Sequence, residues 1–251
     1  MPPREEKPGA RPRYADRAGA ASTSSRRVEA MQIAIVGAGH IGQALARLAR
    51  SAGHEVTISN SRGPETLADL ARELDVVATA AADGVTHADL AVVTVPFTRI
   101  GDIDPAPFVD RLLVDTNNYY PTRDGRIAEL DEHRSTTSEI VQRHFDGARV
   151  VKAFNAILAT DLVPPFGMPA ARRALPVAGD DPEAVTVVRD LHADFGLDTV
   201  DAGPLADSWR FERAKPSYCI PLDEADLRAA LASAERDVEL PHNSWHRTGS
   251  V

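Results

Sequence analysis

The stretch Ile33–Gly42 reads IAIVGAGHIG, four apolar residues followed by the glycine spacing G-x-G-x-x-G. Gly37 suits a tight turn out of a strand, Gly39 lets the backbone approach a pyrophosphate, and Gly42 allows close packing of helix on strand. The N-terminus of the following helix then faces the phosphates. Because an apolar strand precedes the glycines and an alanine- and leucine-rich helix follows them, this stretch predicts a dinucleotide-binding fold.

The second strand, Val56–Ser59, indicates which dinucleotide binds. In NAD-binding proteins a carboxylate about 20 residues past the glycines accepts the 2′-hydroxyl of the ribose. Here that place holds Ser59, Asn60, Ser61 and Arg62, with no acidic residue among them. These groups suit a 2′-phosphate, so the segment predicts NADP(H). The alternative is that Arg62 is a solvated turn residue.

The composition is that of an ordinary globular protein, with 251 residues, 43% hydrophobic and 26% charged. The single cysteine, Cys219, excludes an internal disulfide framework and argues against a metal cluster. No apolar run approaches the roughly 18 residues that a membrane span needs. We therefore expect a cytoplasmic protein with no metal and no membrane partner.

The chain divides into four parts by composition. Residues 1–30 contain four prolines and carry seven Lys/Arg against four Asp/Glu, so we expect a disordered, dispensable extension with Met31 as an alternative start. This extension has a net charge of +3, which leaves −12 for the rest of the −9 chain and argues against nucleic-acid binding. We predict an NADP-binding domain at 31–157, a small C-terminal α+β region for the acceptor or for dimerisation at 158–240, and a flexible tail at 241–251. The C-terminal region has few large apolar groups, and a homodimer would bury its face.

Strand and helix signals alternate after the first glycine loop, which predicts an α/β, doubly wound parallel sheet of the Rossmann type. The expected strands are Gln32–Val36, Val56–Ser59, Val76–Val77, Leu90–Val95, Leu112–Thr116 and Arg149–Phe154, with further short strands at Ala174–Ala178 and Asp198–Asp201. The expected helices span about 40–52, 64–73, 137–145, 182–195, 205–214 and 224–237.

Ligands of open parallel sheets bind beyond the carboxyl ends of the strands. Pro96 and Phe97 follow the fourth predicted strand, and the polar and aromatic run Asn117–Tyr120 follows the fifth, either as part of a site or as loop structure. Lys152 at the sixth strand is either a general acid or anion contact, or a side chain that snorkels from a strand edge. Asn155 is the better site candidate, because it falls at a strand end.

Other polar groups give weaker signals. The histidines lack ligand spacing, and His87, His133, His144 and His192 are expected at the surface. An aromatic and basic group near the C-terminus either walls an acceptor pocket or packs the small region; it comprises Trp209, Arg210, Phe211, Arg213, Lys215 and Tyr218. No motif of a nucleophilic hydrolase or zinc protease occurs.

Together these segments resemble the coenzyme F420:NADP oxidoreductase family, which reduces a deazaflavin. The matching pieces are IAIVGAGHIG, SNSRG, VTVPF, VDTNNYYPTRDG and VVKAFN, in that order. The dinucleotide-binding part is also similar to the NADPH domain of the membrane ferric reductases known as six-transmembrane epithelial antigens. The resemblance implies that the glycines hold pyrophosphate, that Ser59, Ser61 and Arg62 hold the 2′-phosphate, and that Pro96 and Asn155 border the nicotinamide. The full set of predicted cofactor contacts is Gly37, Gly39, His40, Ile41, Gly42, Ser59, Asn60, Ser61, Arg62, Val95, Pro96, Phe97, Asn117, Ala153 and Asn155.

The resulting functional prediction is an oxidoreductase that transfers a hydride between NADP(H) and a deazaflavin or flavin-like acceptor, with coenzyme F420 as co-substrate. The catalytic candidates are Asn155, Lys152 and Tyr119. One alternative is an NADPH-dependent imine or carbonyl reductase, which would need a proton donor such as Tyr119, Tyr120 or Lys152. Another is a module that binds NADPH without turnover.

Overall fold

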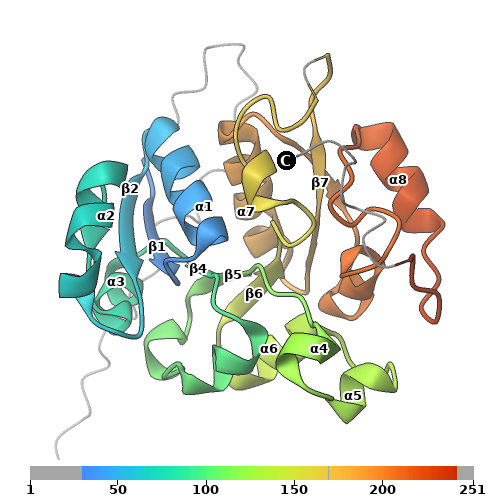
Figure 1. The fold of residues 1–251 in the computed structure, drawn as a ribbon, viewed down its shortest axis with the longest axis horizontal. Helices are drawn as coiled ribbons and strands as arrows, with labels where there is room; N and C mark the ends of the chain where they lie inside the picture. Colours follow the sequence, from blue (N-terminus) through green and yellow to red (C-terminus); the bar gives the residue numbers. More distant parts are fainter. Residues whose placement is uncertain (1–29, 169, 242–251) are drawn as a thin grey trace, which may run out of the picture.

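The computed structural model describes residues 30–168 and 170–241; the predictions for the N-terminal extension and the C-terminal tail fall on 1–29 and 242–251, outside the described residues. One eight-stranded sheet has the order β3-β2-β1-β4-β5-β6-β7-β8 (Figure 1). Its strands are β1 (Gln32–Val36), β2 (Glu55–Ser59), β3 (Val77–Ala78), β4 (Leu90–Val93), β5 (Leu112–Asp115), β6 (Arg149–Lys152), β7 (Ala174–Gly179) and β8 (Asp198–Asp201). The first six strands are parallel, which confirms the predicted Rossmann fold class.

The sheet does not end at β6. β7 pairs with β6 in the antiparallel direction, and β8 then pairs parallel to β7. The predicted region 158–240 therefore continues the sheet of the NADP half, although it also has a small core of its own. In that core Phe211, Tyr218 and Leu227 pack with residues of β7 and β8.

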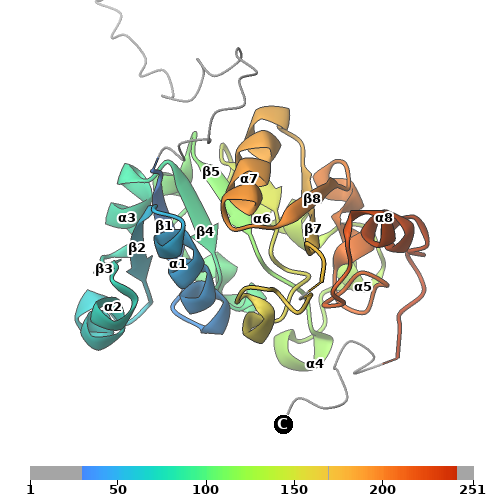
Figure 2. The ribbon, with the colours of Figure 1, turned by 90° about the horizontal axis from the view of Figure 1, so that it is seen from above.

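The helices cover both faces of the sheet (Figure 2). They are α1 (His40–Ser51), α2 (Ala68–Leu74), α3 (Ala81–His87), α4 (Pro121–Asp124), α5 (Ala128–Asp131), α6 (Thr137–His144), α7 (Pro182–Asp194) and α8 (Glu224–Ala232). The 3₁₀ segments are η1 (Pro64–Leu67), η2 (Phe97–Asp102), η3 (Ala106–Phe108), η4 (Ala159–Asp161) and η5 (Leu205–Phe211). Three helices start at side-chain caps, with Thr136 before α6, Asp181 before α7 and Asp223 before α8.

Alternate residues of β1 enter two cores. Ile33 and Ile35 pack with α1 and α7 on one face, whereas Ala34 and Val36 pack with α3 and α6 on the other. Both layers are visible in Figure 2. Because the central strands are buried on both faces, the near-continuous apolar runs of the sequence are explained.

Some elements differ from the sequence prediction. Helix α3 was not expected, since Gly84 lies within it; a Cβ at Gly84 would meet Thr57 Oγ1 at 2.8 Å, so glycine lets this helix approach β2. The predicted helix at 205–214 is the 3₁₀ segment η5, and the one at 224–237 ends at Ala232. Among the described residues, no helix is both long and apolar enough to cross a membrane.

His192 is buried, so its predicted surface position is wrong. Its side chain is fully enclosed, and its Nδ1 lies 2.9 Å from Thr199 Oγ1. Burial lowers the pKa of His192 to about 3. A second histidine, His54, is also enclosed and accepts a hydrogen bond from Met31 N at its Nδ1. Burial lowers the pKa of His54 too, against the opposing charge of Asp194.

Candidate functional site

The glycine loop lies at the carboxyl end of β1, where the strand order turns from β2 on one side to β4 on the other. Gly37 has φ +119°, and a Cβ there would lie 2.6 Å from Thr94 Oγ1. Thr94 Oγ1 donates to Gly37 O at 2.8 Å, and so ties the loop to the end of β4. A Cβ on Gly42 would lie 2.1 Å from Gly37 O. Gly37 and Gly42 are therefore required by packing within the protein.

Gly39 is required for a different reason. No atom lies within 4 Å of a Cβ added to Gly39, so this glycine faces open space in front of helix α1. No side chain caps this helix, and its first turn contains no acidic residue. His40 is exposed in the same turn, while Ile41 packs partly against the core. The free N–H groups and the open approach suit a pyrophosphate, so the residues present fit NADP(H) at this place.

The four residues after β2 divide by their orientation. Ser59 is buried, and its Oγ donates to Ile35 O at 3.3 Å, so its hydroxyl faces the interior. The side chain of Asn60 shapes the turn, because its Oδ1 accepts from Arg62 N and its Nδ2 donates to Thr66 Oγ1, each at 2.9 Å. Ser61 and Arg62 are exposed. These two remain the candidates for a 2′-phosphate, whereas Ser59 and Asn60 support the turn.

The segment after β4 begins with residues that are at least partly exposed and continues into a buried one. Val95 is half-buried and Pro96 is exposed, as a lining role would require. Phe97 instead lies in the core at 5% exposure, with its ring centroid 6.5 Å from that of Tyr119. We infer that Phe97 supports the loop after β5 and does not itself contact a ligand.

Two asparagines join the ends of β5 and β6. Asn118 Nδ2 donates to Asn155 O at 2.9 Å, and Asn155 Nδ2 donates to Asn118 Oδ1 at 3.0 Å. Asn155 Nδ2 also donates to Phe211 O at 3.0 Å. Asn155 Oδ1 is buried and has no hydrogen-bond partner among the described residues. A buried acceptor without a donor costs free energy, so this oxygen suits a ligand amide such as that of nicotinamide.

Lys152 is a structural residue in this geometry. Its Nζ is fully buried and donates to Asn117 O at 2.9 Å, to Thr137 Oγ1 at 2.6 Å and to Ser138 Oγ at 3.1 Å. Asp115 and Glu212 each place a carboxylate oxygen 3.5 Å from the same Nζ. We call these groups the Lys152 network. All three donors of the ammonium are used inside the protein and the side chain is buried, so the strand-edge interpretation is wrong, while the general-acid role stays a prediction.

Two residues next to this network also use their polar groups in hydrogen bonds within the protein. Asn117 is buried, and its Nδ2 donates to Asp115 Oδ1 at 2.8 Å. Ala153 is buried and donates its N–H to Asp115 O at 3.1 Å. Both residues therefore reach a ligand only through their backbone or the edge of a side chain.

Tyr119 is turned away from the strand ends. Its hydroxyl contacts Gly125 O at 2.9 Å and Asp131 Oδ1 at 3.1 Å, and it accepts from Ile127 N at 3.0 Å. Burial raises the pKa of Tyr119. The hydroxyl thus holds the 119–131 loop together, and the structure does not bring this catalytic candidate to Asn155.

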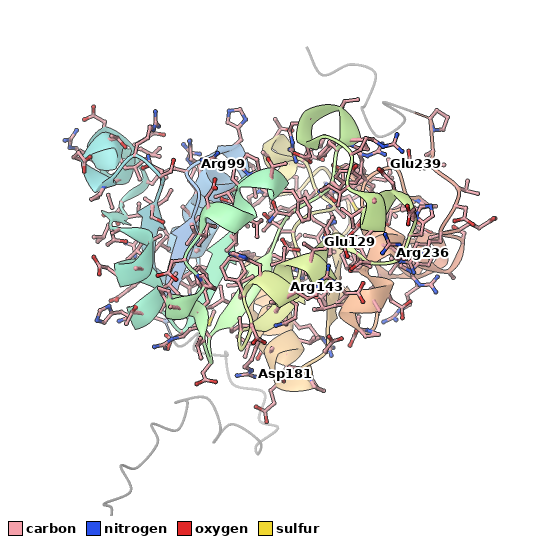
Figure 3. The ribbon with its side chains drawn as sticks, turned by 90° about the horizontal axis from the view of Figure 1, so that it is seen from below. Arg99, Glu129, Arg143, Asp181, Arg236 and Glu239 are labelled. Carbon is pink, nitrogen blue, oxygen red and sulfur yellow. The ribbon has the colours of Figure 1, made fainter. Side chains whose placement is uncertain are left out.

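A cavity of about 280 Å³ lies between this loop and the C-terminal segment. Tyr119, Trp209 and Glu212 line it, together with charged residues of both signs. Arg236 and Glu239, which also line it, lie on one side of the molecule in Figure 3. The cations Arg210, Lys215 and Arg236 surround the Trp209 indole at 4.6, 5.6 and 5.7 Å from its centroid. Lys215 Nζ is saturated by the carbonyls of Glu235, Arg236 and Val238, which makes much of this group structural.

Sequence reasoning missed Glu212 as a partner of Lys152. It also predicted Tyr218 only as core packing or a pocket wall, although the Tyr218 hydroxyl bonds that of Tyr120. Both contacts join segments more than 55 residues apart, and no local spacing marks them. Among the described residues, no cluster of three or more metal-ligating side chains occurs.

Comparison with known proteins places these features in a family. The family model described as NADP oxidoreductase, coenzyme F420-dependent, matches residues 32–119. The structure of the hypothetical protein SMa0349 from Sinorhizobium meliloti is 31% identical with a TM-score of 0.68, covering 76% of this chain and 94% of that one. A protein from Arthrobacter sp. FB24, provisionally assigned as an F420-dependent NADP reductase, is 26% identical with a TM-score of 0.63, covering 71% and 87%.

Two curated relatives match over part of their length. The chain is 42% identical over 65 residues to the protein YjhV of Escherichia coli. This match covers 26% of this chain and 47% of that protein. It is 29% identical over 199 residues to the rat metalloreductase STEAP3, covering 77% and 39%. The chain thus spans less than half of these relatives. The chain belongs to the NADP oxidoreductase family described as coenzyme F420-dependent.

Proposed function

We propose that the protein transfers a hydride between NADP(H) and a planar deazaflavin or flavin-like ring, with coenzyme F420 as the acceptor. The proposal rests on one observation: the two predicted acids, Lys152 and Tyr119, both use their polar groups in hydrogen bonds within the protein. Lys152 Nζ spends its donors inside the protein, and Tyr119 OH is tied to the 119–131 loop. A flat ring that accepts a hydride directly does not require either group to deliver a proton.

The roles of the residues follow from their positions. Gly37, Gly39 and the N-terminus of α1 bind the pyrophosphate, while Ser61 and Arg62 hold the 2′-phosphate. Asn155 orients the nicotinamide amide through its buried Oδ1. NADPH, when bound, supplies the hydride from its nicotinamide ring. The protein chiefly positions the two rings and excludes water between them.

The relatives support this assignment at different levels. The family description names coenzyme F420, and the Arthrobacter relative carries the corresponding provisional assignment.

The test is an anaerobic turnover assay with four acceptors. The full-length protein is mixed with NADPH and, separately, with deazaflavin, FMN, a cyclic imine and a small ketone, while nicotinamide oxidation and acceptor bleaching are both followed. We expect the deazaflavin to be reduced fastest, with NADH a poorer donor. Reduction of only the imine or ketone would replace this proposal with the carbon–nitrogen or carbon–oxygen reductase. NADPH binding with no turnover of any acceptor would identify a binding module.

A further inference from the structure

Two tyrosine hydroxyls meet at the carboxyl edge of the sheet without a role in the proposal so far. Tyr120 OH and Tyr218 OH form a hydrogen bond between residues 98 positions apart. Tyr120 is half-buried, and Tyr218 is 4% exposed. Tyr120 N also donates to Asp124 Oδ2 at 2.9 Å, which fixes the backbone on this side of the pair.

The pair lies beside Asn155. Asn118, two residues before Tyr120, exchanges side-chain hydrogen bonds with Asn155. On the other side, Cys219 N donates to Ala156 O at 3.1 Å, which fixes Tyr218 next to the segment after β6. Both tyrosines therefore flank the strand ends at which the nicotinamide amide is placed by the proposed function.

The two hydroxyls lie in different environments. Tyr218 packs in the apolar core of the C-terminal region, where burial raises the pKa of its hydroxyl and the neighbouring Cys219 and Tyr120 add to the rise. The raised pKa keeps the Tyr218 hydroxyl protonated, and this hydroxyl bonds that of Tyr120. If Tyr218 donates to Tyr120, the Tyr120 proton is left for an acceptor on the more open side.

A cation strengthens the outer hydroxyl as a donor. The Arg123 guanidinium carbon lies 4.6 Å from the centroid of the Tyr120 ring. Arg123 is held there by Asp124 and by Asn118 O, to which its Nη2 donates at 3.1 Å. Positive charge over the ring withdraws electron density from the phenol and favours hydrogen bonding by its O–H.

We propose that Tyr120 OH donates a hydrogen bond to the ring nitrogen or oxygen of the acceptor on which negative charge collects as the hydride arrives, with Tyr218 as the positioning residue behind it. The inference rests on the proposed function. In the step, the nicotinamide C–H bond breaks and a new bond to hydrogen forms on the acceptor ring, C–H for a deazaflavin and N–H for FMN, and the ring gains two electrons. The phenol O–H bond stays intact, and solvent supplies the proton that neutralises the reduced ring. Tyr120 would act as a fixed dipole aimed at developing charge.

The experiment is a single-turnover measurement on NADPH-loaded wild type, Tyr120→Phe and Tyr218→Phe. Deazaflavin and FMN serve as acceptors, and protio and 4-deuterio NADPH identify the hydride step. The matched control is Tyr119→Phe, which removes a hydroxyl from the adjacent residue but not from the pair. Melting temperature and the Kd for NADPH are measured for each variant.

For Tyr120→Phe we expect hydride transfer to slow about tenfold to a hundredfold, with an unchanged Kd for NADPH and a persisting isotope effect. For Tyr218→Phe we expect a loss of roughly threefold to tenfold, again without change in Kd, because the outer hydroxyl loses its support. Tyr119→Phe should lower the melting temperature and alter the hydride rate by less than about threefold.

Four outcomes would overturn the inference. Wild-type rates in Tyr120→Phe would refute it while leaving deazaflavin reduction intact. Equal losses in Tyr119→Phe and Tyr120→Phe would assign the effect to loop structure. Should Tyr120→Phe fail to fold, an unchanged hydride rate in Tyr218→Phe would contradict the proposal, and absence of turnover in the wild type with either acceptor would sink it together with the proposed function.

Discussion

Arg62 lies exposed at the turn after β2, where a single guanidinium can distinguish two dinucleotides. It makes no ion pair or hydrogen bond through its side chain with the described residues, so its removal costs the folded state little. Arg62→Ala should weaken NADPH binding by about 1.5 to 3 kcal/mol and leave NADH binding almost unchanged. Isothermal titration with both dinucleotides measures this, with Arg72→Ala on the exposed face of α2 as the control. Equal losses for NADPH and NADH would remove Arg62 from the 2′-phosphate site.

Gly39 and Gly42 allow a contrast within one motif. A side chain at Gly39 enters open space, whereas one at Gly42 collides with Gly37 O. Gly39→Val should therefore keep the melting temperature and abolish binding of both dinucleotides. Gly42→Val should lose stability as well, because backbone has to move. A folded Gly39→Val that still binds NADPH at wild-type affinity would contradict the pyrophosphate assignment.

The local features were the ones that sequence could predict. Gly37 and Gly42 pack against atoms a few residues away or at the end of the adjacent strand β4. The absence of a carboxylate after β2 can be read directly from the sequence. The orientation of Ser59 was missed, since its inward position depends on the register of β2 against β1. The hydrogen bonds of the Tyr119 hydroxyl were missed too, because its partners belong to a loop with no periodic sequence signal.

Strand ends and helix starts meet in the Lys152 network, which joins β5, β6, α6 and the segment after η5. The carbonyl of Asn117 and the hydroxyls at the start of α6 satisfy the ammonium, while Asp115 and Glu212 balance its charge. No sequence spacing connects Lys152 with Glu212, 60 positions later, so the sequence left this lysine open as an acid, an anion contact or an edge residue.

Lys152→Met should mainly destabilise these elements. The buried Asp115 carboxylate would lose its cation, as would the partly exposed Glu212, and breaking a buried pair costs about 3 to 5 kcal/mol. Turnover per folded molecule should fall roughly tenfold or less, since the lysine positions Asn117 and delivers no proton; general-acid catalysis would lose about a hundredfold to ten-thousandfold. Urea denaturation and the folded fraction at the assay temperature separate the two effects. Arg72→Ala, which breaks an exposed pair with Asp69, should change stability by less than about 1 kcal/mol.

The molecule as a whole combines what sequence predicts well with what it does not. The parallel half followed from alternating strands and helices, and its apolar runs indicated burial on both faces. The direction of β7 could not be predicted, because a strand has the same two-residue period whether its neighbour runs parallel or antiparallel. The homodimer stays a prediction. Phe211, Tyr218 and Leu227 give the C-terminal region a core of its own, so this region depends less on a partner to bury its apolar side chains.

The buried His192 makes the stability of the folded molecule depend on pH. The pKa of His192 is about 3 in the folded protein, against an ordinary value of 6.5 that applies to the unfolded chain. Between these two pH values the unfolded chain therefore binds a proton that the folded protein does not. The stability from this residue is complete above pH 6.5 and is lost as pH falls, by up to about 1.4 kcal/mol per pH unit. His192→Gln should reduce the slope of unfolding free energy between pH 6.5 and 4.5, whereas the exposed His87→Gln should not. Identical slopes for both variants would show that His192 takes up its proton without unfolding.

The reversal at β7 has a consequence for engineering acceptor preference. Up to Asn155 the chain builds the dinucleotide half, and β7 joins its sheet through the pairings of Val151 with Gly179 and Lys152 with Ala178. A chimaera that keeps residues 30–155 and takes the remainder from a relative, with Glu212 and Tyr218 retained, should keep the electron donor of the first parent and change its acceptor preference only through the residues contributed after Asn155.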